Sequence, residues 1–127
     1  MNIYRKTIAA FLLLAGCSLV NAHDFSATVD GQKLFFNIKS KTNKTVEVTY
    51  NGSISDKKNS EVKGVVEIPA KVKHNNVVYS VVSIGAKSFS GAGKLEGVMI
   101  PSTIKSIGGF AFEGCTSLSK IIFPGSE

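Results

Sequence analysis

Arginine is almost absent from this sequence: Arg5 is the only one, and every other permanent positive charge belongs to a lysine. Nucleic-acid sites ordinarily depend on arginine forks and clustered basic residues. Because the lysines are instead scattered over segments expected to form strands and loops, the sequence excludes a nucleic-acid partner. The formal net charge of +6 is explained by solubility and by lysine protection of strand edges, with attraction to anionic glycans or cell surfaces as the alternative.

Histidine and cysteine are also scarce, with two residues each. His23 and His74 cannot form a multi-histidine metal cluster, and no Cys–His pair stands at motif spacing. The serines lack a Gly-x-Ser-x-Gly context. One alternative is an N-terminal copper chelate, created by cleavage before His23 and completed by His74; we set it behind the view that His23 simply follows a cleavage site. The sequence predicts no enzyme, no metal and no cofactor.

Residues 1–22 are predicted to be a signal peptide. Two basic residues precede an apolar run over residues 8–15, and Ala22 ends a small-residue cleavage site. The apolar run is too short to span a bilayer. Cleavage after Ala22 would produce an exported protein, secreted or at the cell surface, that begins at His23.

The same segment supports a second processing route. Residues 14–17, Leu-Ala-Gly-Cys, match the lipobox of bacterial lipoproteins, in which the cysteine is acylated and becomes the mature N-terminus. Acylation of Cys17 would give an outer-membrane lipoprotein with a short tether over residues 18–24. Because Phe25 begins the fold so soon after Ala22, we favour simple cleavage and keep lipidation of Cys17 as the alternative.

A repeat of 23 residues is the most informative feature of the chain. Residues 79–101 and 102–124 align with identities at Ser83/Ser106, Ile84/Ile107, Gly85/Gly108, Phe89/Phe112, Gly91/Gly114, Leu95/Leu118 and Pro101/Pro124. The apolar character of Met99 and Ile122 also agrees. A fixed period of about 20–29 residues indicates a solenoid, in which one short unit stacks on its copy.

The pattern inside each copy indicates how the coil is built. Residues 95–100, Leu-x-x-Val-x-Ile, have the spacing of a leucine-rich repeat, whose period-2 part is a strand. Pro101 and Pro124 follow the strand directly and end it, because proline cannot donate to a ladder. The recurrent glycines are expected where the coil bends sharply.

Residues 100–118, IPSTIKSIGGFAFEGCTSL, are similar to the repeat of the BspA-like leucine-rich-repeat surface proteins. The family pattern is roughly I-P-x-x-V-x-x-I-G-x-x-A-F-x-x-C-x-x-L, and the segment matches it throughout, with Ile104 at the valine position. The preceding copy departs from it at Ser88 and Ala92. The resemblance extends over residues 65–124. It implies a surface or secreted binding module, usually linked to adhesion, without catalysis.

Upstream of the repeats the sequence predicts hairpins and single strands. Asn-Asn between valine-flanked runs predicts a β-hairpin over residues 70–83 that enters the solenoid and shields its first coil. Asp30-Gly31 between alternating runs predicts another hairpin. Strands are expected at 45–50 and 62–68, and the polar segment between them, 51–60, is expected to be a loop.

The predicted protein is mainly β, with a signal peptide (1–22), an N-terminal β cap (23–64) and a leucine-rich-repeat solenoid of about two coils (65–127) that carries the hairpin insertion at 70–83. The expected core consists of Ile84, Phe89, Leu95, Val98, Ile100, Ile104, Ile107, Phe112, Cys115, Leu118 and Ile121.

The predicted function is that of a non-enzymatic exported binding module whose ligand is an unidentified protein or glycan at a cell surface. The alternative is a lipid-anchored outer-membrane scaffold, or a shortened repeat fragment, with no ligand of its own. The last strand, residues 120–123, is expected to lie at an open edge, so self-association through the C-terminal coil is a further expectation.

Overall fold

The structure, a computed structural model, describes residues 23–50 and 61–124. Its regular elements are strands, and the mainly β fold class is confirmed. In chain order they are β1 (Phe25–Val29), β2 (Gln32–Ser40), β3 (Thr45–Thr49), β4 (Lys63–Glu67), β5 (Lys71–His74), β6 (Val77–Ile84), β7 (Lys94–Met99), β8 (Ser106–Ile107) and β9 (Lys120–Ile122).

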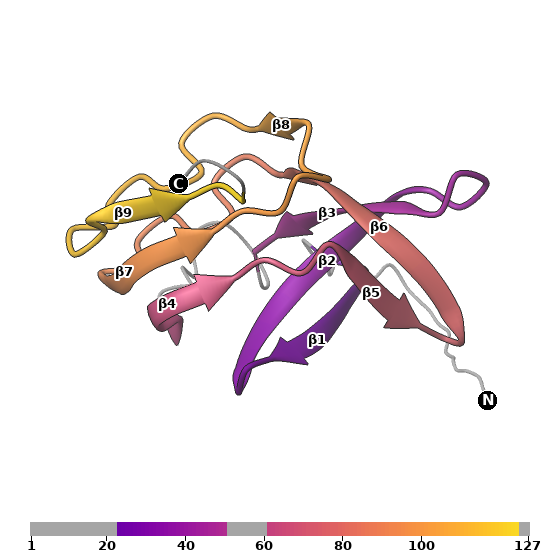
Figure 1. Cartoon of the computed structure of the whole chain (residues 1–127), viewed down its shortest axis with the longest axis horizontal. Helices are drawn as coiled ribbons and strands as arrows, with labels where there is room; N and C mark the ends of the chain where they lie inside the picture. The colour runs from indigo at the N-terminus through magenta and orange to yellow at the C-terminus, as the bar shows by residue number, and fades with distance from the viewer. Residues whose placement is uncertain (1–22, 51–60, 125–127) are drawn as a thin grey trace, which may run out of the picture.

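The strands form two sheets. Sheet A has the order β1-β2-β3-β6-β5, with β8 also paired to β6, and sheet B has the order β4-β7-β9. Figure 1 shows the three strands of sheet B side by side, next to the longer strands of sheet A. The pairs β3–β6, β6–β8, β4–β7 and β7–β9 are all parallel, as stacked turns of a solenoid require.

Each turn of this solenoid contributes one strand to each sheet. We call residues 45–50 and 61–69 coil 1, residues 77–101 coil 2 and residues 102–124 coil 3. Coil 2 supplies β6 and β7, and coil 3 supplies β8 and β9. Coil 1 supplies β3 and β4 in the equivalent places, so that three strand pairs are stacked.

The register of the strands shows that coil 1 belongs to the same series as the two coils found from the sequence. Val48 pairs with Ile84 in sheet A, and Val66 pairs with Val98 in sheet B. The repeat is hidden in the sequence of coil 1 because Val48 is followed by Thr49, where the later copies have Ile-Gly. Strand β3, assigned to the cap on sequence grounds, is thus hydrogen-bonded to the first repeat strand.

Two hairpins flank the stacked coils. The predicted hairpin at Asp30-Gly31 joins β1 to β2, and both turn residues have positive φ, 51° and 81°. Asn75 and Asn76 join β5 to β6 in the same way, with φ of 51° and 65°. Two consecutive left-handed residues form the type I′ turn, whose twist matches that of the flanking strands. Strand β5 pairs with the first half of β6, and the coil 3 strand β8 pairs with the end of β6. The strands β5 and β8 therefore follow one another along the same edge of β6.

Glycine at the Ile-Gly position is required by the close approach of one coil to the next. The Gly85 N–H donates to the Val48 carbonyl at 2.8 Å, and a Cβ on Gly85 would lie 2.9 Å from that oxygen. A Cβ on Gly108 would collide with the backbone of Ala86. The expected reason, a sharp bend, holds for Gly91, whose φ is 81°, but not for Gly85 or Gly108.

The core prediction holds for coil 2 and fails in part for coil 3. Ile84, Phe89, Leu95, Val98 and Ile100 are buried. Ile104, Phe112, Cys115 and Leu118 are partly buried and pack against them. The prediction was wrong for Ile107 and Ile121, whose side chains are 43% and 42% exposed. Both belong to coil 3, on which no further coil packs within the described residues.

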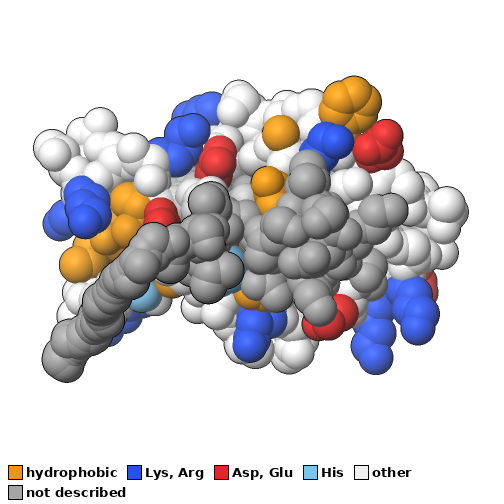
Figure 2. Space-filling view, turned by 180° about the vertical axis from the view of Figure 1, so that it is seen from behind, with side chains coloured by type: hydrophobic (Ala, Val, Ile, Leu, Met, Phe, Trp, Pro, Cys, Tyr) orange, Lys and Arg blue, Asp and Glu red, His pale blue; other side chains and the backbone are white. Residues whose placement is uncertain are grey.

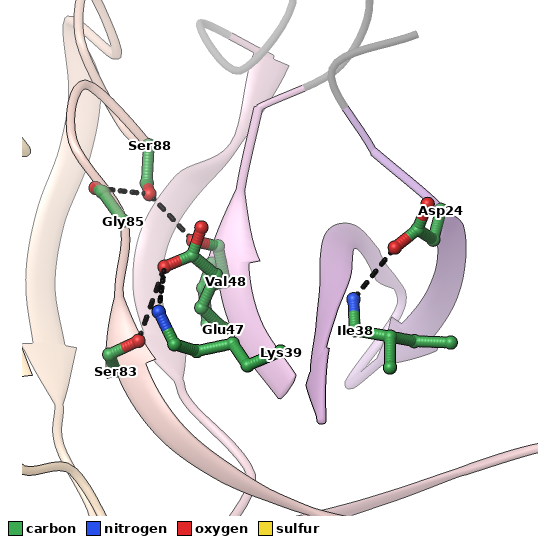
Figure 3. Close-up of polar contacts among 8 residues, drawn as sticks. All are labelled: Asp24, Ile38, Lys39, Glu47, Val48, Ser83, Gly85 and Ser88. Atoms are coloured by element: carbon green, nitrogen blue, oxygen red, sulfur yellow. Dashed lines mark hydrogen bonds and ion pairs between the residues drawn. The ribbon is translucent and has the colours of Figure 1, made fainter. Parts of the chain in front are cut away.

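Polar contacts connect coil 1 to coil 2 (Figure 3). The Glu47 carboxylate accepts a hydrogen bond from the Ser83 hydroxyl at 3.3 Å and lies 3.5 Å from the Lys39 ammonium. The fully buried Ser88 hydroxyl lies 2.6 Å from the Gly85 carbonyl oxygen of its own coil and 2.9 Å from the Val48 carbonyl oxygen of coil 1. Ser88, a departure from the family pattern, is therefore a buried hydroxyl with a carbonyl acceptor in each of two adjacent coils, so that its own burial is not penalised.

Candidate functional site

The residues predicted to direct processing are only partly described. Cys17 and Ala22 lie outside the described residues. His23 packs on the ring of Phe35, with ring centroids 4.8 Å apart, and burial lowers the pKa of its imidazole. His23 therefore takes part in the packing of the first hairpin.

The two histidines do not come together. His74 stacks on Phe25 at 4.1 Å, and Phe25 stacks on Phe36 at 5.3 Å. Since Phe36 and its neighbour Phe35 point to opposite faces of β2, His23 and His74 contact opposite faces of this sheet. Burial also lowers the pKa of His74. Over residues 23–50 and 61–124 no group of three or more His, Cys, Asp or Glu side chains could hold a metal ion.

Cys115 is half-buried, and its thiol lies 3.1 Å from the Phe89 carbonyl oxygen of coil 2. Burial raises the pKa of this thiol. Because a raised pKa lowers the fraction of reactive thiolate, Cys115 has the environment of a structural cysteine. In the described part of the chain, no helix is long and apolar enough to cross a membrane.

The outer face of sheet B, the face turned away from the core, is the candidate binding surface. Inward side chains alternate with outward ones along each strand. The outward residues form three rows across the sheet. The first row is Lys63 and Lys94, the second is Val65, Gly97 and Lys120, and the third is Glu67, Met99 and Ile122. This surface mixes lysines with apolar side chains that are well exposed, Val65 at 45% and Met99 at 39%.

Gly97 makes room for the side chain of Lys120 at the middle of this face. A Cβ on Gly97 would lie 3.0 Å from Cγ of Lys120, and 3.4 Å from both its Cε and Cγ2 of Val65. The methylene chain of Lys120 therefore lies across Gly97 of β7, while the residue as a whole remains exposed, as lysine commonly does over apolar surface.

A hollow of about 300 Å³ opens at the third row. It is lined by Glu67, Ile68, Met99, Ile100, Pro101, Ile122 and Pro124. The two prolines stand where the strands of coils 2 and 3 end, so they form one wall of the hollow. Its size and mostly apolar lining suit one aliphatic or aromatic side chain.

The lysines of the outer face carry charge that their surroundings do not neutralise. Among the described residues the ion pair present is that of Lys39 with Glu47, so Lys63, Lys94 and Lys120 have no carboxylate within ion-pair distance. Figure 2 shows the reverse side of the molecule, where lysine side chains are spread around the outline with apolar patches between them.

The end of coil 3 is a second exposed apolar surface. Ile107, Phe110, Ile121 and Phe123 are all exposed there, Phe110 most of all at 65%. The Lys87 ammonium lies 5.3 Å from the centre of the Phe110 ring. A hollow of about 410 Å³ lies beside them, between the residues of β8 and the segment around Phe123.

Two residues of the outer face stand out in the sequence, which assigns no direction to their side chains. Met99 and Ile122 were noted as matching apolar positions. Because Val98 and Ile100 were predicted to point inward, the period of two along a strand places Met99 outward. That alternation was the available signal for the binding face, whereas the position of Lys120 over Gly97 depends on strand register that only the structure provides.

The repeat region is recognised by comparison with known families. The family model described as BspA type leucine rich repeat region (6 copies) matches residues 69–127. No curated protein matches the chain.

Solved bacterial leucine-rich proteins have a similar structure. A leucine-rich cell surface protein from Faecalibacterium prausnitzii has a TM-score of 0.57 and 27% identity, covering 82% of this chain and 24% of that chain. A leucine-rich repeat protein from Bacteroides ovatus has a TM-score of 0.56 and 36% identity, covering 69% and 21%. One from Bacteroides capillosus has a TM-score of 0.54 and 27% identity, covering 77% and 64%. The chain spans less than two thirds of each of these proteins.

Proposed function

We propose, from the BspA-type leucine-rich repeat region that residues 69–127 form, that this protein is an exported, non-enzymatic binding module that acts in adhesion or protein–protein interaction at a cell surface. Repeat regions of this kind generally serve as binding scaffolds, and one structural relative is described as a cell surface protein. The observation that carries the proposal is the outer face of sheet B. It presents exposed apolar side chains beside lysines that have no ion-pair partner among the described residues.

The test measures binding of the purified protein to immobilised extracellular-matrix proteins and to cultured host cells. Met99→Lys, which places a charge on the outer face without touching the core, should lower that binding. Val78→Lys is the control, because Val78 is also an exposed apolar residue, 50% against 39% for Met99, but lies on β6 in sheet A. Binding no greater than that of a protein of scrambled sequence, or equal loss in both variants, would contradict the proposed function.

The mature N-terminus decides between a released protein and a lipid-anchored one. Mass spectrometry of the protein from its native host should find an N-terminus at His23 if the signal peptide is simply removed. An acylated Cys17, together with accumulation of uncleaved precursor in Cys17→Ala, would instead establish an outer-membrane lipoprotein.

Self-association through coil 3 is a second candidate property, favoured by the exposure of its apolar side chains. Ile107 and Ile121 are exposed, whereas the equivalent side chains of coil 2 are covered by coil 3. A second copy of the chain could cover Ile107 and Ile121 in the same way. Light scattering over a range of concentrations should show dimers of the wild-type protein and monomers of Ile107→Ser/Ile121→Ser. Wild-type protein that stays monomeric at high concentration would refute this.

A further inference from the structure

The outer face of sheet B has a basic end and an apolar end. Lys63 and Lys94 stand opposite each other in register at the start of the strands. Met99 and Ile122 stand opposite each other near the strand ends, beside the hollow of about 300 Å³. Lys120 lies between the two ends, across Gly97. The partner of this face should therefore differ in character along its own length.

The basic end lacks compensation from within the described structure. Like charges directly opposite each other on neighbouring strands are destabilising, and Lys63 faces Lys94 in this way. Glu96 is the exposed extra residue at the irregularity of β7, and it forms no ion pair with either lysine. A carboxylate from outside the chain would relieve the repulsion between the lysines, so the basic end fits an acidic group.

The apolar end excludes an acidic group. Glu67 forms part of the wall of the hollow, next to Met99, and would repel a second carboxylate there. The remaining lining is aliphatic or proline, apart from the Met99 thioether, which adapts its shape to an inserted side chain. The hollow therefore fits an uncharged apolar side chain.

We infer that the outer face of sheet B binds an extended acidic segment of a protein, with the carboxylates of the segment over Lys63, Lys94 and Lys120 and one aliphatic or aromatic side chain in the hollow beside Met99. Neighbouring rows lie about 7 Å apart, so the acidic and apolar groups of the partner are separated by about 7–14 Å. An extended segment of about four residues spans that distance. An anionic polysaccharide supplies the negative groups but no side chain for the hollow.

This inference rests on the proposed binding function and is tested with synthetic peptides and the purified protein. The probe is fluorescein-labelled Asp-Glu-Asp-Gly-Leu-Gly-Ser, and its binding is measured by fluorescence polarisation. Two matched peptides replace the acidic residues by their amides, or the leucine by glycine. The acidic leucine peptide should bind at least about tenfold more tightly than either, and its affinity should fall as the salt concentration rises.

Variants of the protein locate the binding. Lys94→Gln/Lys120→Gln should lower the affinity for the acidic peptide about tenfold or more. The control with the same change in charge is Lys71→Gln/Lys73→Gln on β5, which should leave that affinity unchanged. Glu67→Gln should strengthen binding, since it removes the repulsion at the apolar end. Met99→Lys should abolish the preference for leucine over glycine. Thermal melts establish that each variant is folded.

The possible outcomes distinguish failure of the inferred acidic partner from failure of the proposed binding function. Equal affinity for the acidic and the amide peptides, or equal effects of the two lysine double variants, would overturn the inference. Binding of heparin oligosaccharide that needs Lys94 and Lys120 but not Met99 would overturn it in favour of an anionic glycan. If matrix proteins or cells bind through Met99 while the acidic peptide does not, the proposed function stands and the inferred partner is wrong.

Discussion

Coil 2 and coil 3 repeat the same sequence pattern, but their side chains have different surroundings. Ile84 is 1% exposed, whereas its copy Ile107 is 43% exposed, and the same contrast separates Val98 from Ile121. The residues differ little in size or chemistry. What differs is that coil 3 covers coil 2, while no described coil covers coil 3. Burial in a solenoid is therefore determined by the neighbouring coil, and identical positions contribute unequally to stability.

The largest difference is expected at the paired phenylalanines, whose rings stack 5.5 Å apart. Phe89→Ala should lower the free energy of unfolding by about 3–5 kcal/mol, because it leaves a cavity among buried side chains. Phe112→Ala should cost about half as much, since Phe112 is only partly buried and the site can collapse or hydrate. Chemical denaturation of the two single variants measures both values, and equal losses would contradict the contrast between the coils.

A second comparison concerns the glycines at the junctions between coils. Gly85→Ala should cost about 1–3 kcal/mol, because the added methyl would press on the Val48 carbonyl and the Glu47 side chain. Gly108→Ala should cost at least as much, because its methyl would meet the backbone of Ala86. Gly109→Ala is the control: its added methyl has no neighbour within 4 Å. Thermal melts in which all three variants behave alike would show that the coils are not in close contact here.

A great deal of this fold could be predicted from local sequence patterns. The 23-residue period, a strand at residues 95–100 and the Asp30-Gly31 turn are all predicted by local pattern. The structure contains the turn and a strand one position earlier, at Lys94–Met99. The third strand pair was missed because β3 lacks the Ile-Gly pair by which the later copies were aligned. The exposure of Ile107 and Ile121 was missed because a sequence pattern gives the inward direction of a side chain but not the presence of a covering coil.

The candidate site was less predictable than the fold. Alternation along β7 indicates that Met99 points outward, and the repeat extends this to Ile122. The pairing of Lys63 with Lys94 depends on β4 lying beside β7, although 31 positions separate the two lysines in sequence. The side chain of Lys120 can lie across the neighbouring strand only because Gly97 has no side chain there. Such relations arise from tertiary pairing, so composition and spacing do not reveal them.

The smallest expected effect is at the turn that follows the Ile-Gly position. Lys87 and Phe110 occupy the same place in coils 2 and 3, and both have left-handed backbone, with φ of 61° and 59°. This conformation costs an ordinary L-residue about 1–2 kcal/mol, whereas asparagine tolerates it better. Phe110→Asn should therefore stabilise the protein by about 0.5–1 kcal/mol, and Lys87→Asn should have a smaller effect. A lower melting temperature for Phe110→Asn would show that the ring of Phe110 is supported by contacts that outweigh its strain.

The stacking of coil 3 on coil 2, with no described coil on the far side of coil 3, is tested most directly by amide hydrogen exchange of the dilute protein. The amides of β7 lie between two strands, whereas β9 is the edge strand of sheet B. We expect the amides of β7 to exchange at least about tenfold more slowly than those of β9, because an edge strand opens without unfolding the stack. Equal protection of β7 and β9 at low concentration would contradict the account, since it would require that coil 3 is covered as fully as coil 2.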